Sequence, residues 1–435
     1  MAIQVKQLTL PVQIALPLIQ KPDYTTDVLI AGAGPGGAST SIFLAKEKIQ
    51  HIIIDKAVFP RNKVCGDALS GKSVGMLKRM LPGWKQHFLT DKSKSIVSSG
   101  IQFIAANDTM LDIPFFSKDI DENNQPGFVS KRIDFDNMLA GLIDQQYATL
   151  MTGTSLEDIQ EREDGLLVII KQAGQLKTIF TKMIVGAEGR GSLVAKKLAH
   201  HTMDAAHFSA GIRGYYQNVS GMHEQQYIEM HFLKELQPGY LWIFPLPDGA
   251  ANVGVGMLSK TIASKKANLK QLMQDAIAKH PNIKHRFTNA VLQGDIEGWG
   301  LPLGSKKRSL SGSRFVLTGD AASLIDPFTG EGIGNAMVSG LVASRVIKKA
   351  VEADDFSAAA LKQYDEDLYK KLWAELKLSH YLQILTSKPG LLNFVIGKAS
   401  RSKELRATLS CMFENVDIRK KLTNPIFYLK ILFNR

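Results

Sequence analysis

The chain has 435 residues, of which 45% are hydrophobic and 22% are charged, and its formal net charge is +12. These values are typical of a soluble globular protein and exclude a disordered chain, while the length exceeds what one hydrophobic core usually supports. We therefore expect at least two domains. Two cysteines, Cys65 and Cys411, are too few for a disulfide framework, which favours a reducing, cytoplasmic compartment. Neither a signal peptide nor an apolar run long enough to span a membrane is expected.

The first recognisable unit covers residues 27–56. Its pattern predicts a buried strand, a glycine turn, a helix and a second strand ending at Asp55. The turn Gly32-Ala33-Gly34-Pro35-Gly36-Gly37 has glycine where a tight turn, a close approach to a pyrophosphate and close helix–strand packing require it, at positions 32, 34 and 37. An acid at the end of the next strand suits a ribose hydroxyl. The unit predicts dinucleotide binding, with NAD and FAD both open.

In the rest of the chain, segments with the pattern of strands alternate with segments with the pattern of helices. Residues 101–128 are polar and predicted to be irregular, and a helix is expected to start near Asp134. Residues 166–189 indicate two strands joined at Ala173-Gly174 and then another strand. An antiparallel sheet broken by a helix at 266–278 is expected over 203–300, and helical structure with a break at Pro389-Gly390 over 361–435.

The segment FVLTGDAASLIDPFTGEGIGNAM, residues 315–337, resembles the second FAD contact of the para-hydroxybenzoate hydroxylase-like flavoproteins. This resemblance implies FAD as the cofactor. It also implies that Asp320 binds the ribityl chain and that the amides of Gly332 and Ile333 face the pyrimidine end of the flavin, where reduced flavin gathers negative charge. The alternative for Asp320 is a helix N-cap.

Two further segments resemble the same group. IVGAEGRGSLVAKKL is similar to its middle motif but carries Glu188 where aspartate is usual, which puts a contact with the pyrophosphate in doubt. Arg132, in VSKRIDFDNML, matches the arginine that precedes a helix near the flavin. Its alternative role is a surface ion pair.

Residues 59–70, FPRNKVCGDALS, resemble the PRxKxCG segment of the geranylgeranyl reductase family, which passes beside the flavin ring. The resemblance places Cys65 in the active site as the catalytic residue, with a buried structural cysteine as the alternative. The contacts to the cofactor that we expect in these segments, besides those already given, come from Gly36, Lys56, Arg61, Cys65, Gly66 and Ala68.

The segment YLWIFP is similar to the YxWxFP motif that lines the lipid tunnel of geranylgeranyl reductases. Alternation along a strand places Tyr240, Trp242 and Phe244 on one face, as an apolar wall for an isoprenoid or aromatic substrate. The same three residues would also suit a core.

Together these patterns predict an α/β fold with a Rossmann-like FAD-binding domain interleaved with an antiparallel-sheet substrate domain, plus a helical C-terminal segment. The expected boundaries are a tail at 1–22, an FAD-binding domain of 23–95, 129–200 and 301–352, a substrate-binding domain of 96–128 and 201–300, and a helical region at 353–435.

The resemblance implies an FAD-dependent reductase of carbon–carbon double bonds in a prenyl or other hydrophobic substrate. Because a second dinucleotide motif is not seen, the reductant is expected to be external, NAD(P)H or reduced ferredoxin, and the basic chain suits an acidic protein donor. One alternative is a flavin-dependent monooxygenase or halogenase, since Trp242 and Pro245 match the WxWxIP motif of halogenases although Tyr240 and Phe244 do not. Another is a flavoprotein that only carries lipid. Neither a metal nor a nucleic acid is expected.

The last residues, IRKKLTNPIFYLKILFNR, contain no acid and alternate basic with bulky apolar side chains. Two interpretations are open: a peripheral contact with the inner face of the membrane, and a helix that packs its apolar side on the protein.

Overall fold

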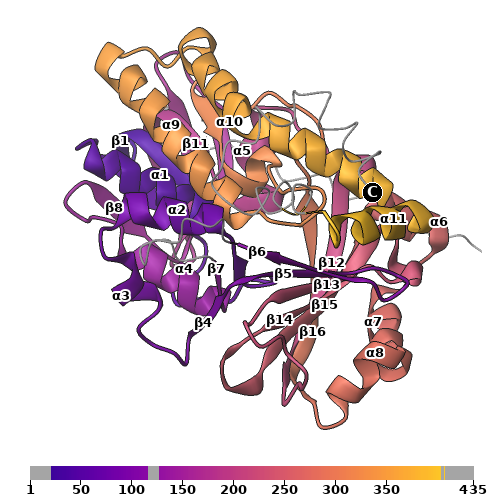
Figure 1. Cartoon of the computed structure of the whole chain (residues 1–435). Helices are drawn as coiled ribbons and strands as arrows, with labels where there is room; N and C mark the ends of the chain where they lie inside the picture. Colours follow the sequence, from indigo (N-terminus) through magenta and orange to yellow (C-terminus); the bar gives the residue numbers. More distant parts are fainter. Residues whose placement is uncertain (1–20, 116–126, 403–405, 407–435) are drawn as a thin grey trace, which may run out of the picture.

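The computed structural model describes residues 21–115, 127–402 and 406. In this part of the chain the strands form sheets of eight, seven and three strands (Figure 1). The expected α/β fold is confirmed, whereas the division into domains at the boundaries given above stays a prediction.

The eight-stranded sheet is parallel at its centre, where β1 (Tyr24–Ala31) lies between β2 (His51–Ile54) and β11 (Gln175–Gly186). Its other strands are β8 (Ala148–Met151), β9 (Thr154–Glu161), β10 (Leu166–Gln172), β17 (Ser311–Gly312) and β18 (Phe315–Leu317). The order is β17-β18-β11-β1-β2-β8, and β10 and β9 extend β11 as antiparallel strands. β11 is one long strand, so the separate third strand expected here was wrong.

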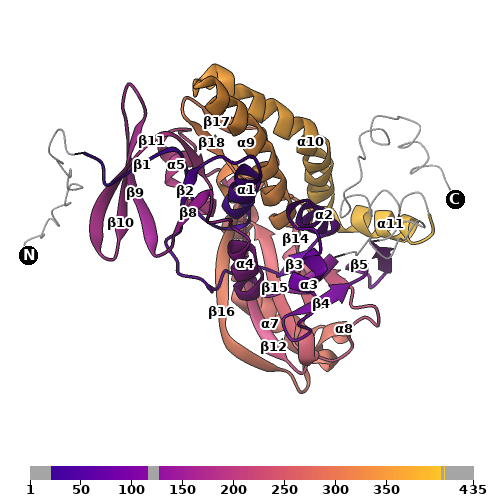
Figure 2. The same ribbon diagram turned by 90° about the vertical axis from the view of Figure 1, so that its left-hand side faces the viewer.

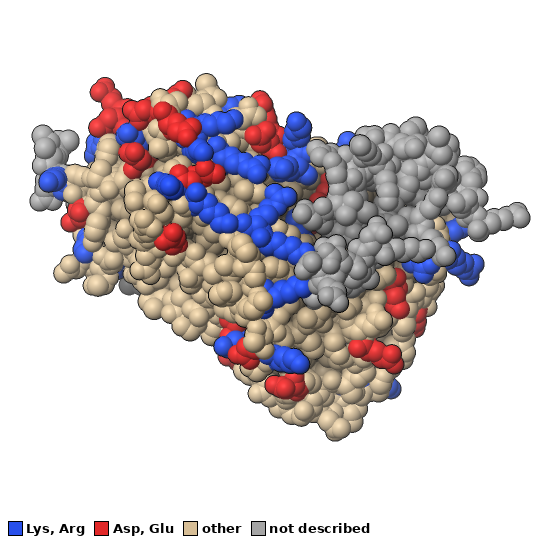
Figure 3. Space-filling view, turned by 60° about the vertical axis from the view of Figure 1, so that its left-hand side comes forward, with Lys and Arg blue, Asp and Glu red and all other residues tan. Residues whose placement is uncertain are grey.

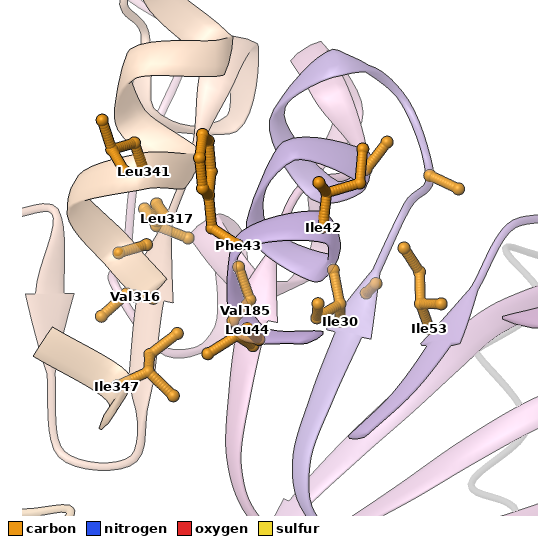
Figure 4. Packing of buried hydrophobic residues seen from close by; sticks show 14 of the residues in the cluster. Ile30, Ile42, Phe43, Leu44, Ile53, Val185, Val316, Leu317, Leu341 and Ile347 are labelled. Atoms are coloured by element: carbon orange, nitrogen blue, oxygen red, sulfur yellow. The ribbon is translucent and has the colours of Figure 1, made fainter. Parts of the chain in front are cut away.

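Two helices, α1 (Pro35–Lys46) and α9 (Ile333–Ala353), pack on each other over this sheet. Figure 4 shows Ile30 of β1 and Val185 of β11 beneath apolar side chains of both helices. A Cβ at Gly340 would lie 2.8 Å from the carbonyl oxygen of Gly36, so glycine lets α9 approach the start of α1 closely. The glycine turn is therefore held between a sheet and a second helix.

The seven-stranded sheet is antiparallel apart from one parallel pair, β5 with β13. Its strands, in spatial order, are β16 (Val291–Pro302), β12 (Phe208–Gln217), β15 (Ala251–Leu258), β14 (Gly239–Pro245), β13 (Ile228–His231), β5 (Gly100–Ile104) and β6 (Met110–Pro114). The prediction that residues 101–128 are irregular was wrong for β5 and β6, because buried side chains such as Ile101 and Ile113 pack in the core of this sheet.

A small third sheet lies between the eight-stranded and the seven-stranded sheet. It consists of β3 (Ala68–Leu69), β7 (Gly127–Ser130) and β4 (Ser95–Ser98) in that order. After β7 the chain enters α4 (Arg132–Gly141), which begins two residues before the expected start at Asp134.

The remaining helices lie around these sheets (Figure 2). They are α2 (Gly71–Met80), α3 (Trp84–Phe88), α5 (Leu193–Lys197), α6 (Ser259–Lys265), α7 (Leu269–Lys279), α8 (Pro281–Lys284), α10 (Ala358–Leu385) and α11 (Pro389–Ala399). The break expected at Pro389 is where α11 begins. Among the helices of the described part, none is long and apolar enough to cross a membrane.

Candidate functional site

The glycine turn joins β1 to α1. Gly32 has φ +100°, and a Cβ there would lie 2.4 Å from the carbonyl oxygen of Ala187. A Cβ at Gly37 would lie 1.8 Å from the carbonyl oxygen of Gly32. Gly34 is the N-cap of α1 and has no side chain to cap it, so the first amides of the helix are available to an anion. The turn therefore offers backbone amides to a phosphate.

Asp55 directly follows β2, which ends at Ile54, one residue before the expected end, and Asp55 is 8% exposed. One carboxylate oxygen accepts a hydrogen bond from the amide of Ala33 at 2.8 Å, and the other accepts one from the amide of Ala57 at 2.8 Å. Asp55 thus fixes the glycine turn itself, and each oxygen keeps a lone pair for a ribose hydroxyl. Lys56, expected to contact the cofactor, is exposed.

Two arginines share one buried carboxylate beside the glycine turn. Arg132 donates to Asp136 through Nε at 2.6 Å and Nη2 at 2.7 Å, and Nη1 of Arg61 lies 2.8 Å from the same carboxylate. The ion pair of Arg132 is buried, so the alternative of a surface ion pair was wrong. Burial opposes the charge of Arg132, but Asp136 and the neighbouring Cys65 sulfur raise its pKa.

This cluster carries one more positive than negative charge. Nη2 of Arg61 lies 3.6 Å from where a Cβ on Gly34 would stand. The excess charge is therefore beside the amides of the turn, as binding of a pyrophosphate requires.

Asp320 lies in the turn between β18 and α9. The turn is a short 3-10 helix whose N-cap is Thr318, so Asp320 lies inside it and is not its cap. Its Oδ1 lies 3.7 Å from the Cβ position of Gly332, which caps α9 and precedes Ile333, the first residue of α9. Burial raises the pKa of Asp320, while the charges of Lys63 and Arg132 oppose this rise. The structure thus brings the carboxylate to the N-terminus of α9.

Glu188 does not point freely into the site. Its carboxylate accepts hydrogen bonds from the hydroxyl of Ser192 at 2.6 Å and from the amides of Leu193 and Val194 at 3.0 and 3.1 Å. The longer side chain reaches the first two amides of α5, whose N-cap is Ser192, and its negative charge suits this end of the helix.

Lys63 is a site residue to which sequence reasoning gave no role. Its Nζ lies 3.6 Å from the ring centroid of Trp299, and the guanidinium of Arg190 lies 4.7 Å from the same centroid. Burial lowers the pKa of Lys63 to about 8, although the charge of Asp320 opposes this effect. Lys63 belongs to the segment 59–70 that the sequence analysis singled out. Its contact with Trp299 could not be predicted, because that ring lies more than 200 residues away in the chain.

Asp67 is fully buried directly after the Cys65-Gly66 pair. Its Oδ2 accepts hydrogen bonds from the hydroxyl of Tyr215 and from Nδ2 of Asn252, both at 2.8 Å. Burial raises the pKa of Asp67 to about 6, and these hydrogen bonds oppose the rise.

Asn252 joins three elements. Its Nδ2 also donates to the carbonyl oxygen of Cys65 at 2.7 Å, and its Oδ1 accepts a hydrogen bond from the indole of Trp242 at 2.9 Å. The half-buried Cys65 is thereby tied to β14 and β15 of the seven-stranded sheet. Sequence reasoning gave no individual role to Asp67 or Asn252, because their pairing depends on the tertiary fold.

Tyr240, Trp242 and Phe244 form a row along β14, with 6.2 Å between neighbouring ring centroids. A cavity of about 50 Å³ is lined by Tyr240 and Trp242, together with apolar residues such as Leu301. Phe244 contributes to the row at its other end, where its ring lies 2.9 Å from the Cβ position of Gly66. The row therefore runs from the Cys65-Gly66 pair into an apolar cavity.

The residues around the glycine turn fit an FAD. The hydroxyl of Thr318 is buried beside Gly36 and has no hydrogen-bond partner in the described part of the chain. It joins the amides of the glycine turn and the charge of Arg61 as a group ready to bind a polar ligand. The described residues contain no cluster of His, Cys, Asp and Glu that suits a metal.

Comparison with known proteins identifies the family of the chain. The model of the FAD binding domain matches residues 25–374. The digeranylgeranylglycerophospholipid reductase of Thermoplasma acidophilum is 27% identical over 79% of this chain and 83% of its own length. The menaquinone reductase of Mycolicibacterium smegmatis is 24% identical over 82% of this chain and 81% of its own.

Solved structures share the fold. A geranylgeranyl bacteriochlorophyll reductase-like protein from Thermoplasma acidophilum superimposes with a TM-score of 0.78 at 23% identity, covering 92% of this chain and 99% of that one. A flavin-dependent brominase gives 0.77 at 20% identity, with 94% and 98% covered. Because the family model spans most of the sequence, the chain belongs to the FAD-binding domain family of flavoprotein oxidoreductases.

Proposed function

We propose that this protein is an FAD-dependent reductase that saturates carbon–carbon double bonds in a prenyl or other hydrophobic chain. The observation that carries the proposal is the pair of hydrogen bonds through which Asn252 connects the backbone carbonyl of Cys65 to Trp242, a residue that lines the apolar cavity. The names of the relatives, reductases of a digeranylgeranyl lipid and of menaquinone, support the same class of substrate.

The cofactor site is proposed from the placement of its side chains. The glycine turn and Arg61 bind the pyrophosphate, Asp55 accepts from the ribose, and Asp320 accepts from the ribityl chain. The first amides of α9, at Gly332 and Ile333, face the flavin pyrimidine. Bound FAD, once reduced, supplies hydride to one carbon of the double bond.

The chain's own residues supply the proton and the orientation. Tyr240, Trp242 and Phe244 align the apolar chain along β14. The thiol of Cys65, or a water beside it, donates a proton to the second carbon, so that hydride and proton together saturate the bond.

The reductant is external in this proposal and is NAD(P)H or reduced ferredoxin. Figure 3 shows Lys and Arg side chains gathered in a band across one face of the molecule, which supports an acidic protein donor. A cytoplasmic location with a peripheral contact at the inner face of the membrane suits a lipid substrate. The C-terminal segment 418–435, to which that contact was first assigned, lies outside the described residues.

A second candidate function is that of a monooxygenase or halogenase, in which the reduced flavin reacts with oxygen. The fold shared with a flavin-dependent brominase supports this candidate.

One experiment distinguishes the reductase from the oxygen-using enzyme: anaerobic reduction of the yellow protein, followed by mixing with a polyprenyl lipid or with air. We expect the lipid to restore the flavin absorbance without oxygen and to gain hydrogen by mass. Reoxidation by oxygen alone, through a transient hydroperoxide band, would support the second candidate.

A further inference from the structure

The end of α10 presents apolar side chains to solvent. Tyr381 is 57% exposed and Ile384 is 50% exposed, and they lie three residues apart on one side of the helix. Lys388, seven residues after Tyr381, is also exposed. Tyr381 and Ile384 thus form an apolar stripe at the end of α10, and Lys388 follows in the connection to α11.

α11 repeats this spacing. Leu391 is 45% exposed and Phe394 is 48% exposed, and Lys398 follows seven residues after Leu391. The other side of α11 is buried through Leu392 and Ile396. A helix that is apolar on both its buried and its exposed side is unusual at a surface in contact only with water.

The segment that carries these stripes has charge of one sign. Residues 376–402 contain Lys377, Lys388, Lys398 and Arg401 and no Asp or Glu. Lysines that border exposed aromatic and aliphatic side chains are typical of helices that lie in the interface of an anionic bilayer.

The buried sides of the same helices enclose an apolar cavity of about 20 Å³, lined by Leu382 and Leu385 of α10 and by Leu392 of α11. Phe232 and Phe328 line both this cavity and the one beside Tyr240 and Trp242. Apolar side chains therefore continue from α10 and α11 to the aromatic row.

We propose that the exposed stripes of α10 and α11 dock this protein on an anionic lipid bilayer. The inference rests on the proposed function in one respect: a prenyl substrate held in that bilayer enters through the apolar residues beneath the two helices. Tyr381, Ile384, Leu391 and Phe394 insert among the lipids, while the basic residues contact the headgroups.

The test is flotation of the full-length holoprotein with vesicles of phosphatidylcholine and phosphatidylglycerol, compared with pure phosphatidylcholine. We expect binding to the anionic vesicles and a loss of roughly tenfold or more in the double variant Ile384→Ser, Phe394→Ser, because two inserted side chains become polar. The matched control is Leu176→Ser, Met203→Ser, which removes two exposed apolar side chains elsewhere and should float like the wild type.

Equal flotation of the two double variants, or a wild type that stays in solution, would overturn the docking surface. So would dissociation of a wild-type dimer by the Ile384→Ser, Phe394→Ser changes without any flotation, since a second copy would then cover the stripes.

Activity separates this inference from the proposed function. We expect the Ile384→Ser, Phe394→Ser variant to reduce a detergent-dispersed polyprenyl lipid at the wild-type rate and a vesicle-embedded one more slowly. A wild type that floats but reduces neither form retains the docking surface and refutes the reductase. Equal rates of wild type and variant on the embedded lipid contradict entry through these helices.

Discussion

Cys65 lies beside a buried cation, and the next residue, Gly66, lies against the ring of Phe244. Arg132 neighbours the Cys65 sulfur, and the carbonyl oxygen of Cys65 is fixed by Asn252. This setting favours a proton donor that is held in place without being locked in the core, because the side chain is only half buried.

We expect Cys65→Ala and Cys65→Ser to retain FAD and to lose turnover by roughly hundredfold, the usual contribution of a positioned general acid. Bound flavin is measured by absorbance, and turnover by reoxidation with a polyprenyl lipid. Val64→Ala, at the adjacent half-buried position, is the control and should keep its rate. An unchanged rate in Cys65→Ala would remove the thiol from the mechanism.

Asp67 gives the stability of the protein a pH dependence. Its pKa rises from 3.8 to about 6 in the folded protein, so between these values the folded state binds more protons than the unfolded state. The contribution of Asp67 to the free energy of unfolding therefore falls as pH rises from about 4 to about 6. The fall is about 3 kcal/mol, because one pKa unit corresponds to roughly 1.4 kcal/mol.

Denaturant unfolding of wild type and Asp67→Asn at pH 4 and pH 6.5 measures this contribution. We expect the loss of stability between the two pH values to be smaller in Asp67→Asn, since the other buried acids are the same in both proteins. An identical pH dependence would mean that Asp67 is ionised in the folded protein throughout this range.

At the scale of elements, the turn from β1 to α1 depends on close packing that only glycine allows. A Cβ at Gly37 meets the carbonyl oxygen of Gly32, whereas a Cβ at Gly141, near the end of α4, meets nothing within 4 Å. Replacement by alanine can therefore be compared at the two glycines, one in close contact and one in open space.

We expect Gly37→Ala to be purified without flavin colour or to fail to fold, because the helix and the turn must separate. Gly141→Ala should keep its FAD and gain up to about 1 kcal/mol from helix propensity. Absorbance of the purified proteins and thermal unfolding measure both effects. A yellow Gly37→Ala protein would contradict binding of the cofactor at this turn.

At the scale of the whole molecule, the chain leaves the eight-stranded sheet, contributes β5 and β6 to the seven-stranded sheet, and returns. The site residues are drawn from both regions and from the turns between them. Binding of FAD should therefore stabilise the eight-stranded and the seven-stranded sheet as one unit.

We expect the holoprotein to unfold in one transition, with tryptophan fluorescence and release of flavin changing at the same temperature. Free FAD at a hundredfold excess over its Kd should add about 2.7 kcal/mol to the stability. Two separate transitions, with flavin released in the first alone, would show that the sheets unfold independently.

The sequence by itself determined the glycine turn and the acid Asp55 directly after the next strand, because the residue types that these features require lie close together in the chain. The choice of FAD came from the resemblance of residues 315–337 to a segment of known flavoproteins. The sequence also placed Tyr240, Trp242 and Phe244 on one face, since alternation is a local property of a strand. The structure shows these three rings in a row.

Only the tertiary structure decided the contacts between distant segments. Asn252 reaches Asp67 across 185 residues, and Lys63 contacts the ring of Trp299 across more than 200 residues. The strands β5 and β6 were missed because their ladder is completed by β13, whose position no local pattern reveals. Burial, and with it the pKa values of Lys63 and Asp67, arises when these segments pack together, so it follows from the fold and not from any one stretch of the chain.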